Sequence, residues 1–403
     1  MSTMSPLVLR HFTATSCIGR GLEATLDSLR AQRSGLAPCG FETVTLETHV
    51  GEVSGVDDTR LPASLQRFDC RNNRLAQLGL GEDGFIEAVA ACSGRWGPRR
   101  VGLFLGTSTS GMLETEIAYR QRDPGTGALP AGFDYAGTHN SYSLAAFVHA
   151  ALGLDGPSAV VSSACSSSAK VFGSARRMIA AGLIDAALVG GVDSLCLTTL
   201  YGFHSLQLVS RDPCKPFDIA RDGISIGEAA AFALIERPPE SLDRDAVLLL
   251  GVGESSDAYH MSSPHPEGRG ARDAMLQALA GAGLTPGDID YINLHGTGTP
   301  SNDSAEGKAV AAVFGDRSEA VPASSTKGAT GHTLGAAGAL EAVICALSLR
   351  HGLLPGSAHT RHVDPSLGFD YLLANRRQPI ARALSNSFGF GGSNCALVLG
   401  RAG

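Results

Sequence analysis

The stretch AVVSSACSSSAKVFG, residues 159–173, holds the local pattern that decides the fold of this chain. It opens with a β-branched run, passes through small residues and continues as a helical pattern after Cys165. The pattern predicts a strand, a tight turn and a helix, with Cys165 at the helix N-terminus. There, unpaired backbone N–H groups and the helix dipole favour the thiolate, which is the nucleophilic form of cysteine. A buried structural cysteine followed by a serine cap is the alternative.

The alternation of strand and helix continues on both sides of this stretch. Apolar or β-branched runs predict strands, and Ala- and Leu-rich stretches that end near glycine predict helices. The strands fall at 101–105, 159–163, 186–189, 231–235, 246–252, 289–294 and 396–399, and the helices at 166–181, 270–282, 303–313 and 335–351. Such alternation indicates an α/β fold with parallel sheets covered on both faces.

A second glycine-rich turn at 387–394 resembles the turn at Cys165 in pattern rather than in residues, which indicates an internal duplication. The polar, proline-containing segment 236–245 is the expected seam. We therefore predict two halves, residues 1–240 and 241–403.

Composition excludes several classes of protein. The net charge of −7 comes without a sustained basic run, so we expect no nucleic-acid partner. No signal peptide or apolar run of membrane-spanning length is evident, and we expect a cytoplasmic protein without a membrane contact. The nine cysteines form no CxxC pair, so neither a disulfide framework nor a zinc site is expected.

Two histidine motifs lie in the second half. NLHGTGTPSND, residues 293–303, follows an apolar run and breaks into a Gly/Thr turn, which places His295 at a strand end. SSTKGATGHTLGAAGALE, residues 324–341, puts Lys327 and His332 in a glycine-rich loop before a helix. Such a loop can also hold a phosphate, but it lacks the Gly-Lys-Ser/Thr pattern of a nucleotide-binding loop.

Together with LSNSFGFGGSN, residues 384–394, these motifs resemble the β-ketoacyl-[acyl carrier protein] synthases in residue type and in order. SSACSSSAK is similar to their nucleophile motif, and HGTGT and GFGGSN are similar to their later loops. The resemblance spans nearly the whole chain and is weakest over the first hundred residues. It implies a thiolase-like, duplicated αβαβα layered fold with two mixed five-stranded sheets.

The resemblance also implies roles for site residues. Cys165 would carry the acyl group, and His295 and His332 would stabilise the enolate formed when a malonyl thioester loses carbon dioxide, without a metal. Lys327 and Glu341 would support the histidines. The resemblance assigns the oxyanion hole to the backbone N–H groups of Cys165 and Phe390, with Phe390 also acting as a gate. Asp303 and Asn394 would be structural supports.

Substrate contacts follow from the same resemblance. Thr297 and Thr299 would bind the phosphopantetheine arm of an acyl carrier, so that no other cofactor is expected, and Phe203 and Phe388 would contact the substrate. The segment GTSTSGM, residues 106–112, is similar to a loop of the acyl pocket. Thr109 stands there in place of a bulkier aliphatic residue, which leaves room for a longer chain such as an aryl polyene.

The partners that the resemblance implies are an acyl carrier protein and a second subunit, as a homodimer or with a chain-length-factor-like subunit. Carrier proteins are acidic, and Arg67, Arg71 and Arg74 lie at helical spacing along one expected face, so we expect them to dock the carrier. The dimer is expected to bury the strand that follows Gly182.

Two other functions stay open at the level of the sequence. A non-catalytic chain-length-factor-like subunit would lack the nucleophile, whereas this chain retains Cys165. A thioester hydrolase needs a nucleophile and a base, but it does not account for the second histidine with its lysine.

Overall fold

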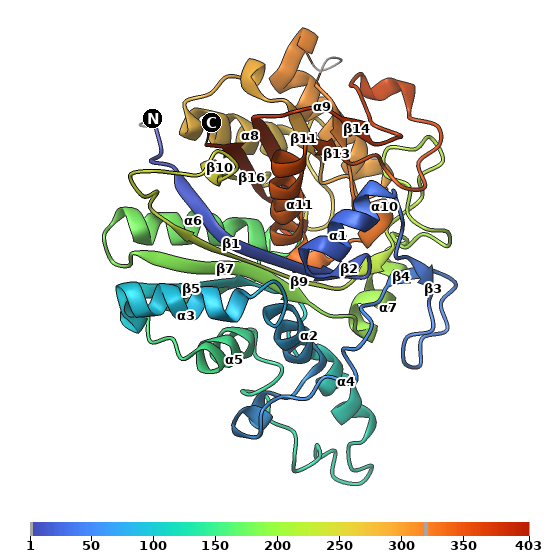
Figure 1. Cartoon of the computed structure of the whole chain (residues 1–403). Coiled ribbons are helices and arrows are strands. Elements are labelled where there is room, and N and C mark those ends of the chain that lie inside the picture. Colours follow the sequence, from blue (N-terminus) through green and yellow to red (C-terminus); the bar gives the residue numbers. More distant parts are fainter. Residues whose placement is uncertain (1–2, 318–320, 403) are drawn as a thin grey trace.

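One mixed sheet runs through the computed structural model, which describes residues 3–317 and 321–402 (Figure 1). Its strands, in spatial order, are β6 (Ser158–Val161), β5 (Val101–Gly106), β7 (Ala186–Asp193), β9 (Ala229–Glu236), β1 (Leu7–Ser16), β10 (Val247–Ser256), β16 (Ser393–Arg401), β15 (Arg382–Gly389), β11 (Tyr291–Asn293) and β12 (Ala323–Ser324), with β2 (Gly19–Arg20) beside β1. Each half of the chain contributes five of the ten strands along this path.

The two sets of five strands have the same pairing. The three outer strands of each set are parallel, β6–β5–β7 in one and β12–β11–β15 in the other. In the first set β9 is antiparallel to both β7 and β1, and in the second set β16 is antiparallel to both β15 and β10. A short pairing of Leu7–Leu9 with Val247–Leu249 joins the sets edge to edge. The sheets are therefore mixed, as the resemblance implies, and less parallel than strand–helix alternation alone indicates.

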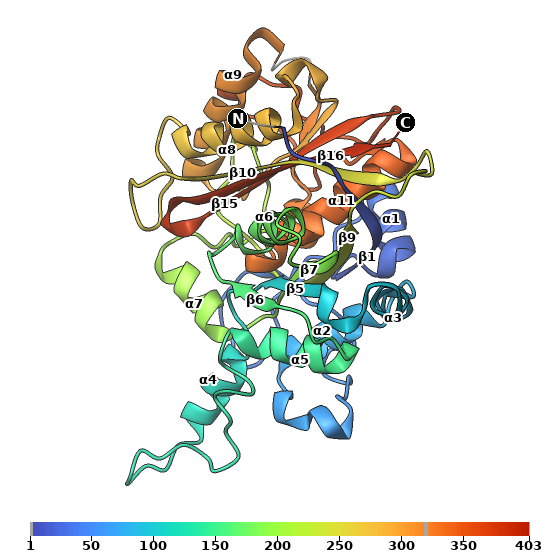
Figure 2. The ribbon, with the colours of Figure 1, turned by 90° about the vertical axis from the view of Figure 1, so that its left-hand side faces the viewer.

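Two helices fill the space between the sets of strands. α6 (Ser167–Ala180) packs on β5 and β7, and α11 (Ala337–His351) packs on both sets, where Figure 2 shows the pair at the centre of the molecule. The stretch Leu334–His351 has the length and apolar character of a membrane-spanning helix, but 89% of it is buried inside the fold. It is therefore a core helix.

Outer helices complete the layers. α2 (Arg71–Leu80), α3 (Phe85–Trp96) and α5 (Tyr142–Leu152) cover the first half, and α8 (Arg269–Ala282) and α9 (Pro300–Phe314) cover the second. The remaining elements are α1 (Gly21–Arg30), α4 (Met112–Arg120), α7 (Leu197–Ser205), α10 (Lys327–Thr330), β3 (Ala37–Pro38), β4 (His49–Gly51), β8 (Ile226–Gly227), β13 (Leu353–Leu354) and β14 (Arg376–Arg377).

The expected helices and strands are present to within a few residues, and the structure adds helices and strands that were not expected, among them α1, α3, α5 and α7. β1 was not expected, and most of β15 belongs to a segment interpreted as a loop. β15 is polar in sequence but buried, and its Asn386 donates to Glu306 of α9. The predicted boundary at residue 240 falls in the loop between β9 and β10, and the division into two domains stays a prediction.

Candidate active site

The nucleophile candidate lies on a tight turn between β6 and α6. Ala164, just before Cys165, has a φ of +53°, a left-handed conformation that costs a non-glycine residue free energy. Serines hold the turn closed: Ser163 N donates to Ser167 Oγ at 2.8 Å, and Ser166 Oγ donates to the Ser163 carbonyl at 3.0 Å. The run of serines thus fixes the turn that presents the sulfur.

The two histidines reach the same point from the other half of the chain. His295 follows β11, and His332 follows α10. His332 Nε2 lies 3.0 Å from Cys165 Sγ, and the two imidazole rings are 5.3 Å apart at 83°. All three side chains are buried, and their ligand-type atoms lie within 4.8 Å of one another. The predicted convergence of one sulfur and two imidazoles is present.

The protonation state of Cys165 differs from the expectation. Burial raises the pKa of its thiol to about 11, although the charge of Lys327 and hydrogen bonds from the Phe390 and Cys165 backbone N–H groups act in the opposite direction. The helix N-terminus therefore does not by itself produce a thiolate at neutral pH. His332 Nε2 is placed to accept the proton when the sulfur reacts.

Both histidines are neutral. Burial lowers the pKa of each well below its ordinary value, and the charge of Lys327 lowers it further. Lys327 Nζ lies 3.4 Å from His295 Nδ1, and an ammonium group can only donate, so Nδ1 accepts and the proton of this ring sits on Nε2. His295 consequently offers an N–H donor to the cavity.

Lys327 is held in turn by an ion pair with Glu341, and both side chains are buried. Burial raises the pKa of Glu341 to about 7, and the lysine opposes this shift. The thiol and two imidazoles are close enough to bind a metal ion together. However, the Lys327 contact puts a proton on the His295 nitrogen that faces them and an ammonium group behind the ring, and both disfavour a cation there.

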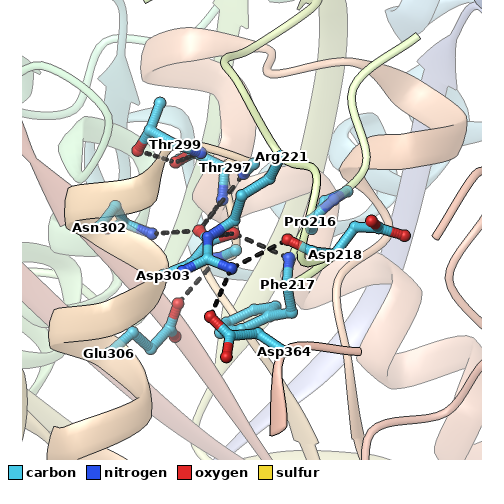
Figure 3. Close-up of polar contacts among 12 residues, drawn as sticks. Pro216, Phe217, Asp218, Arg221, Thr297, Thr299, Asn302, Asp303, Glu306 and Asp364 are labelled. Carbon is cyan, nitrogen blue, oxygen red and sulfur yellow. Dashed lines mark hydrogen bonds and ion pairs between the residues drawn. The ribbon is translucent and has the colours of Figure 1, made fainter. Parts of the chain in front are cut away.

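The turn after His295 carries two threonines. Thr297 Oγ1 and Thr299 Oγ1 are 2.8 Å apart, and both residues line the cavity beside the sulfur. Asp303, on α9, accepts from Thr297 N at 3.0 Å and is fully buried, which agrees with a supporting role (Figure 3).

Glu306 is a site residue that the sequence analysis missed. One of its carboxylate oxygens accepts from His295 N and the other from Gly296 N, both at 2.8 Å. It lies on α9 one turn after Asp303, so the helical spacing could have indicated that both acids face the same turn. Burial raises the pKa of Glu306 to about 7.

The cavity holds about 590 Å³ of empty space, part of which is open to solvent. Phe203 and Phe390 pack against each other in it, with ring centroids 5.4 Å apart, and Phe388 packs on His295 at 5.8 Å. Asn394 also lines the cavity and donates to Asp257 at 3.0 Å. Lining residues that the sequence analysis did not anticipate are Leu208, Ile224, Asp257, Ser262, Ser263, Pro264, Ser301 and Asn302.

The role of Thr109 in the acyl pocket stays a prediction. Thr109 is buried, its hydroxyl donates to Asp193 at 2.8 Å, and it is not among the described residues that line this cavity. Asp193 also accepts from Thr107 Oγ1 and Gly335 N, so it connects the acyl-pocket loop with the segment after His332.

The predicted docking arginines are only partly available. Arg71 is buried, with 3% of its side chain exposed, and it binds the buried Glu228 as well as Asp57 and Glu52 at the surface, so its assignment to docking is wrong. Arg74 is paired with Asp69 at 2.6 Å. Arg67 remains exposed, although its side chain lies 3.9 Å from Asp134. The expected single helical face is also wrong, because Arg67 lies in a 3-10 helix, Ala63–Phe68, that ends before α2 begins at Arg71.

Comparison with known proteins identifies the family of this chain. The N-terminal domain model of the β-ketoacyl synthases matches residues 87–241, and the C-terminal domain model matches residues 246–361. Nodulation protein E of Rhizobium meliloti is 38% identical over 305 residues, which cover 74% of this chain and 75% of that protein. The 3-oxoacyl-[acyl-carrier-protein] synthase 2 of Staphylococcus aureus is 34% identical over 317 residues, 74% of this chain and 76% of that protein.

Solved structures give the same result at the level of the fold. A chain of the complex of ketosynthase ApeO with its chain length factor ApeC, from Xenorhabdus doucetiae, superposes with a TM-score of 0.86 at 37% identity and covers 99% of this chain and 98% of that one. The ishigamide ketosynthase/chain length factor gives 0.88 at 28% identity over the whole of both chains. The chain thus belongs to the β-ketoacyl synthase family, acyltransferases with the thiolase-like fold.

Proposed function

We propose that this chain is a 3-oxoacyl-[acyl carrier protein] synthase that joins an acyl group held on Cys165 to a malonyl group held on an acyl carrier protein. The contact that carries this proposal is the cluster of Cys165 Sγ, His332 and His295 at the inner end of the cavity.

In the first step the Cys165 sulfur attacks the carbonyl carbon of an acyl thioester. His332 accepts the thiol proton across the 3.0 Å contact, and this proton leaves with the carrier thiol. The Cys165 and Phe390 backbone N–H groups, which lower the pKa of the thiol, would donate to the oxyanion of the intermediate.

In the second step the bond between the malonyl methylene carbon and its carboxylate breaks, carbon dioxide leaves, and the electron pair becomes an enolate. The Nε2–H of His295 donates to the enolate oxygen. The carbanion carbon then attacks the acyl carbonyl, a carbon–carbon bond forms, and the bond to Cys165 breaks. One proton is consumed overall, and it restores the thiol.

The reaction needs no cofactor beyond the phosphopantetheine arm of the carrier, which Thr297 and Thr299 would bind. For the second subunit, we propose another copy of this chain or a chain-length-factor-like protein, because two similar solved structures pair a ketosynthase with a chain length factor. Nine cysteines without a disulfide support a reducing, cytoplasmic location. The pathway would be fatty acid or polyketide synthesis, with aryl polyenes included.

A product assay tests this function. The protein is incubated with acyl-loaded and malonyl-loaded carrier protein. The masses of the carrier-bound products are then measured by mass spectrometry. We expect a 3-oxoacyl group two carbons longer than the primer, together with carbon dioxide. A free acid without carbon dioxide would indicate a thioester hydrolase instead, and no turnover would indicate a non-catalytic partner subunit.

A further inference from the structure

A buried arginine lies beside Asp303, the carboxylate that binds the threonine turn. Arg221 belongs to the segment between α7 and β8, and only 8% of its side chain is exposed. Figure 3 shows its guanidinium group between Asp303 and Asp364. Nη1 donates to Asp364 Oδ2 at 2.9 Å and to the Asp218 carbonyl at 2.9 Å, and Nε lies 3.8 Å from Asp303 Oδ2.

Asp303 is the group through which Arg221 reaches the cavity. One carboxylate oxygen accepts from Thr297 N at 3.0 Å and Gly298 N at 3.3 Å, and the other accepts from Phe217 N at 2.8 Å. Three backbone N–H groups from two segments therefore depend on one fully buried carboxylate. A buried carboxylate is stable only when a positive charge or several hydrogen bonds compensate its loss of solvation.

The charge of Arg221 supports the form of Asp303 that the turn requires. Burial raises the pKa of Asp303, and hydrogen bonds together with the nearby guanidinium of Arg221 oppose this rise. A protonated Asp303 would point an O–H at a backbone N–H and lose an acceptor.

Arg221 also joins three segments that are distant in sequence. Its own segment binds the threonine turn directly, since Gly223 N donates to the Gly298 carbonyl at 3.0 Å. The segment that begins at Asp364 is tied to the same place, because Asp364 N donates to the Phe217 carbonyl at 3.0 Å. The arginine is the cation at the meeting point of these segments.

We infer that Arg221 is a positioning residue for the substrate arm: acting through Asp303, it holds Thr297 and Thr299 where their hydroxyls face the cavity. This inference rests on the proposed function, in which those hydroxyls bind the arm of the carrier. Arg221 does not touch the reacting atoms, so its effect belongs to substrate binding rather than to the chemistry at Cys165.

The test compares Arg221→Met, which keeps the length and removes the charge, with Arg221→Lys, which keeps the charge. We expect Arg221→Met to raise KM for malonyl carrier about tenfold or more while kcat changes by less than about threefold, because a lost ground-state contact acts on KM. Arg221→Lys should recover most of this loss. Iodoacetamide should alkylate Cys165 at the same rate in all three proteins.

Arg100→Met is the matched control. Arg100 pairs with Asp185 at 2.7 Å, just before the start of β7, whereas the site lies at the other end of that strand. We expect the KM and kcat of Arg100→Met to equal those of the wild type. A tenfold rise of KM in this control would mean that loss of any ion pair has the same effect, and it would overturn the inference.

A double-mutant cycle tests the route through Asp303. If Arg221 acts through it, Arg221→Met should add little to the KM of Asp303→Asn, whereas independent residues would give multiplied effects. If Arg221→Met does not fold, Arg221→Gln serves instead, since it also removes the charge while its amide N–H can donate to the neighbouring acceptors. It should raise KM in the same direction, and an unchanged KM would reject the inference. A wild type that makes no 3-oxoacyl product would reject the proposed function itself.

Discussion

At the scale of single residues, the site combines a protonated thiol with two neutral imidazoles. Burial is the shared cause, since it disfavours every charged form in the cavity. Lys327 is the charged exception, and Glu341 neutralises it. The site thus places a neutral proton acceptor, His332, beside the sulfur. It also places a neutral N–H donor, His295, where the enolate would form.

The pKa of Cys165 leads to a direct prediction. Because burial raises the pKa of the thiol to about 11, the thiolate fraction should increase about tenfold per pH unit between pH 7 and 10. We expect the rate of iodoacetamide alkylation at Cys165, followed by mass spectrometry of its peptide, to rise throughout this range. A plateau below pH 9 would contradict this protonation state and support a thiolate stabilised by the helix N-terminus.

Lys327→Met should remove the donor that fixes the tautomer of His295. We expect decarboxylation of malonyl carrier to slow by about 10²–10³-fold, the usual effect of losing one oxyanion donor. Because the charge of Lys327 lowers the pKa of both histidines, the variant should also lose more of its residual activity as the pH falls below 7. The double variant Lys327→Met/Glu341→Gln is the control, since it leaves no unpaired buried carboxylate. Full decarboxylation in both variants would exclude this role of the lysine.

At the scale of elements, the position of the nucleophile depends on close contact between β5 and α6. A Cβ atom added to Gly106 would lie 2.4 Å from Ser168 N and 2.6 Å from the Ser167 carbonyl carbon, which are backbone atoms of the helix that follows Cys165. The backbone of α6 would have to shift, and with it the turn that holds the sulfur.

Gly106→Ala should therefore lower both stability and activity. We expect the free energy of unfolding to fall by about 1–3 kcal/mol, as for other overpacked cores, and acylation of Cys165 to slow. Gly94→Ala is the matched control, because Gly94 lies on α3 and no atom lies within 4 Å of a Cβ added there. The free energy of unfolding of this variant should increase by up to about 1 kcal/mol. Denaturant unfolding of the two variants checks both values, and equal stability would refute the contact.

The secondary structure was predictable where local pattern and burial agree. The strand, turn and helix around Cys165 follow from a β-branched run and small residues, and α11 follows from its apolar composition. β15 could not be predicted, because it is buried between β11 and β16 although its sequence is polar, and the partner of the Asn386 amide N–H, Glu306, is far away in sequence. Burial of Arg71 also depends on distant acids, including Glu228.

The site was predictable only through the family resemblance. Local pattern places His295 and His332 at turns, but it cannot bring them to Cys165, since they are more than 100 residues away in the chain. The same limit applies to Thr109, whose sequence position suggested the acyl pocket but not the hydrogen bond from its hydroxyl to Asp193. Contacts between distant residues decide these outcomes.

At the scale of the whole molecule, the sheet ends at β6 on one side and at β12 on the other. The strand after Gly182, β7, lies between β5 and β9, so it cannot be the strand that a second subunit pairs with, and that expectation is wrong. β6 is the open edge of the first half, with partly exposed side chains. An open edge of this kind can pair with another chain.

We therefore expect the dimer to form at β6. Pro157 and Val161 accept from β5 through their carbonyl groups, so the N–H of Val160, at the alternate position, points away from β5. Val160→Pro removes that outward donor and should convert the dimer into monomers, as measured by light scattering after size exclusion. Circular dichroism should remain unchanged. A dimer that persists with unchanged affinity would place the interface elsewhere.

The central claim is that one sulfur and two histidines from distant parts of the chain perform both halves of one reaction. In the most direct measurement, the protein is first incubated with the acyl-loaded carrier alone, and the adduct is mapped by mass spectrometry. Malonyl-loaded carrier is then added. We expect the acyl mass on the Cys165 peptide, followed by its loss with one carbon dioxide and one 3-oxoacyl carrier per adduct. An adduct on another residue, or one that malonyl carrier does not discharge, would contradict the account.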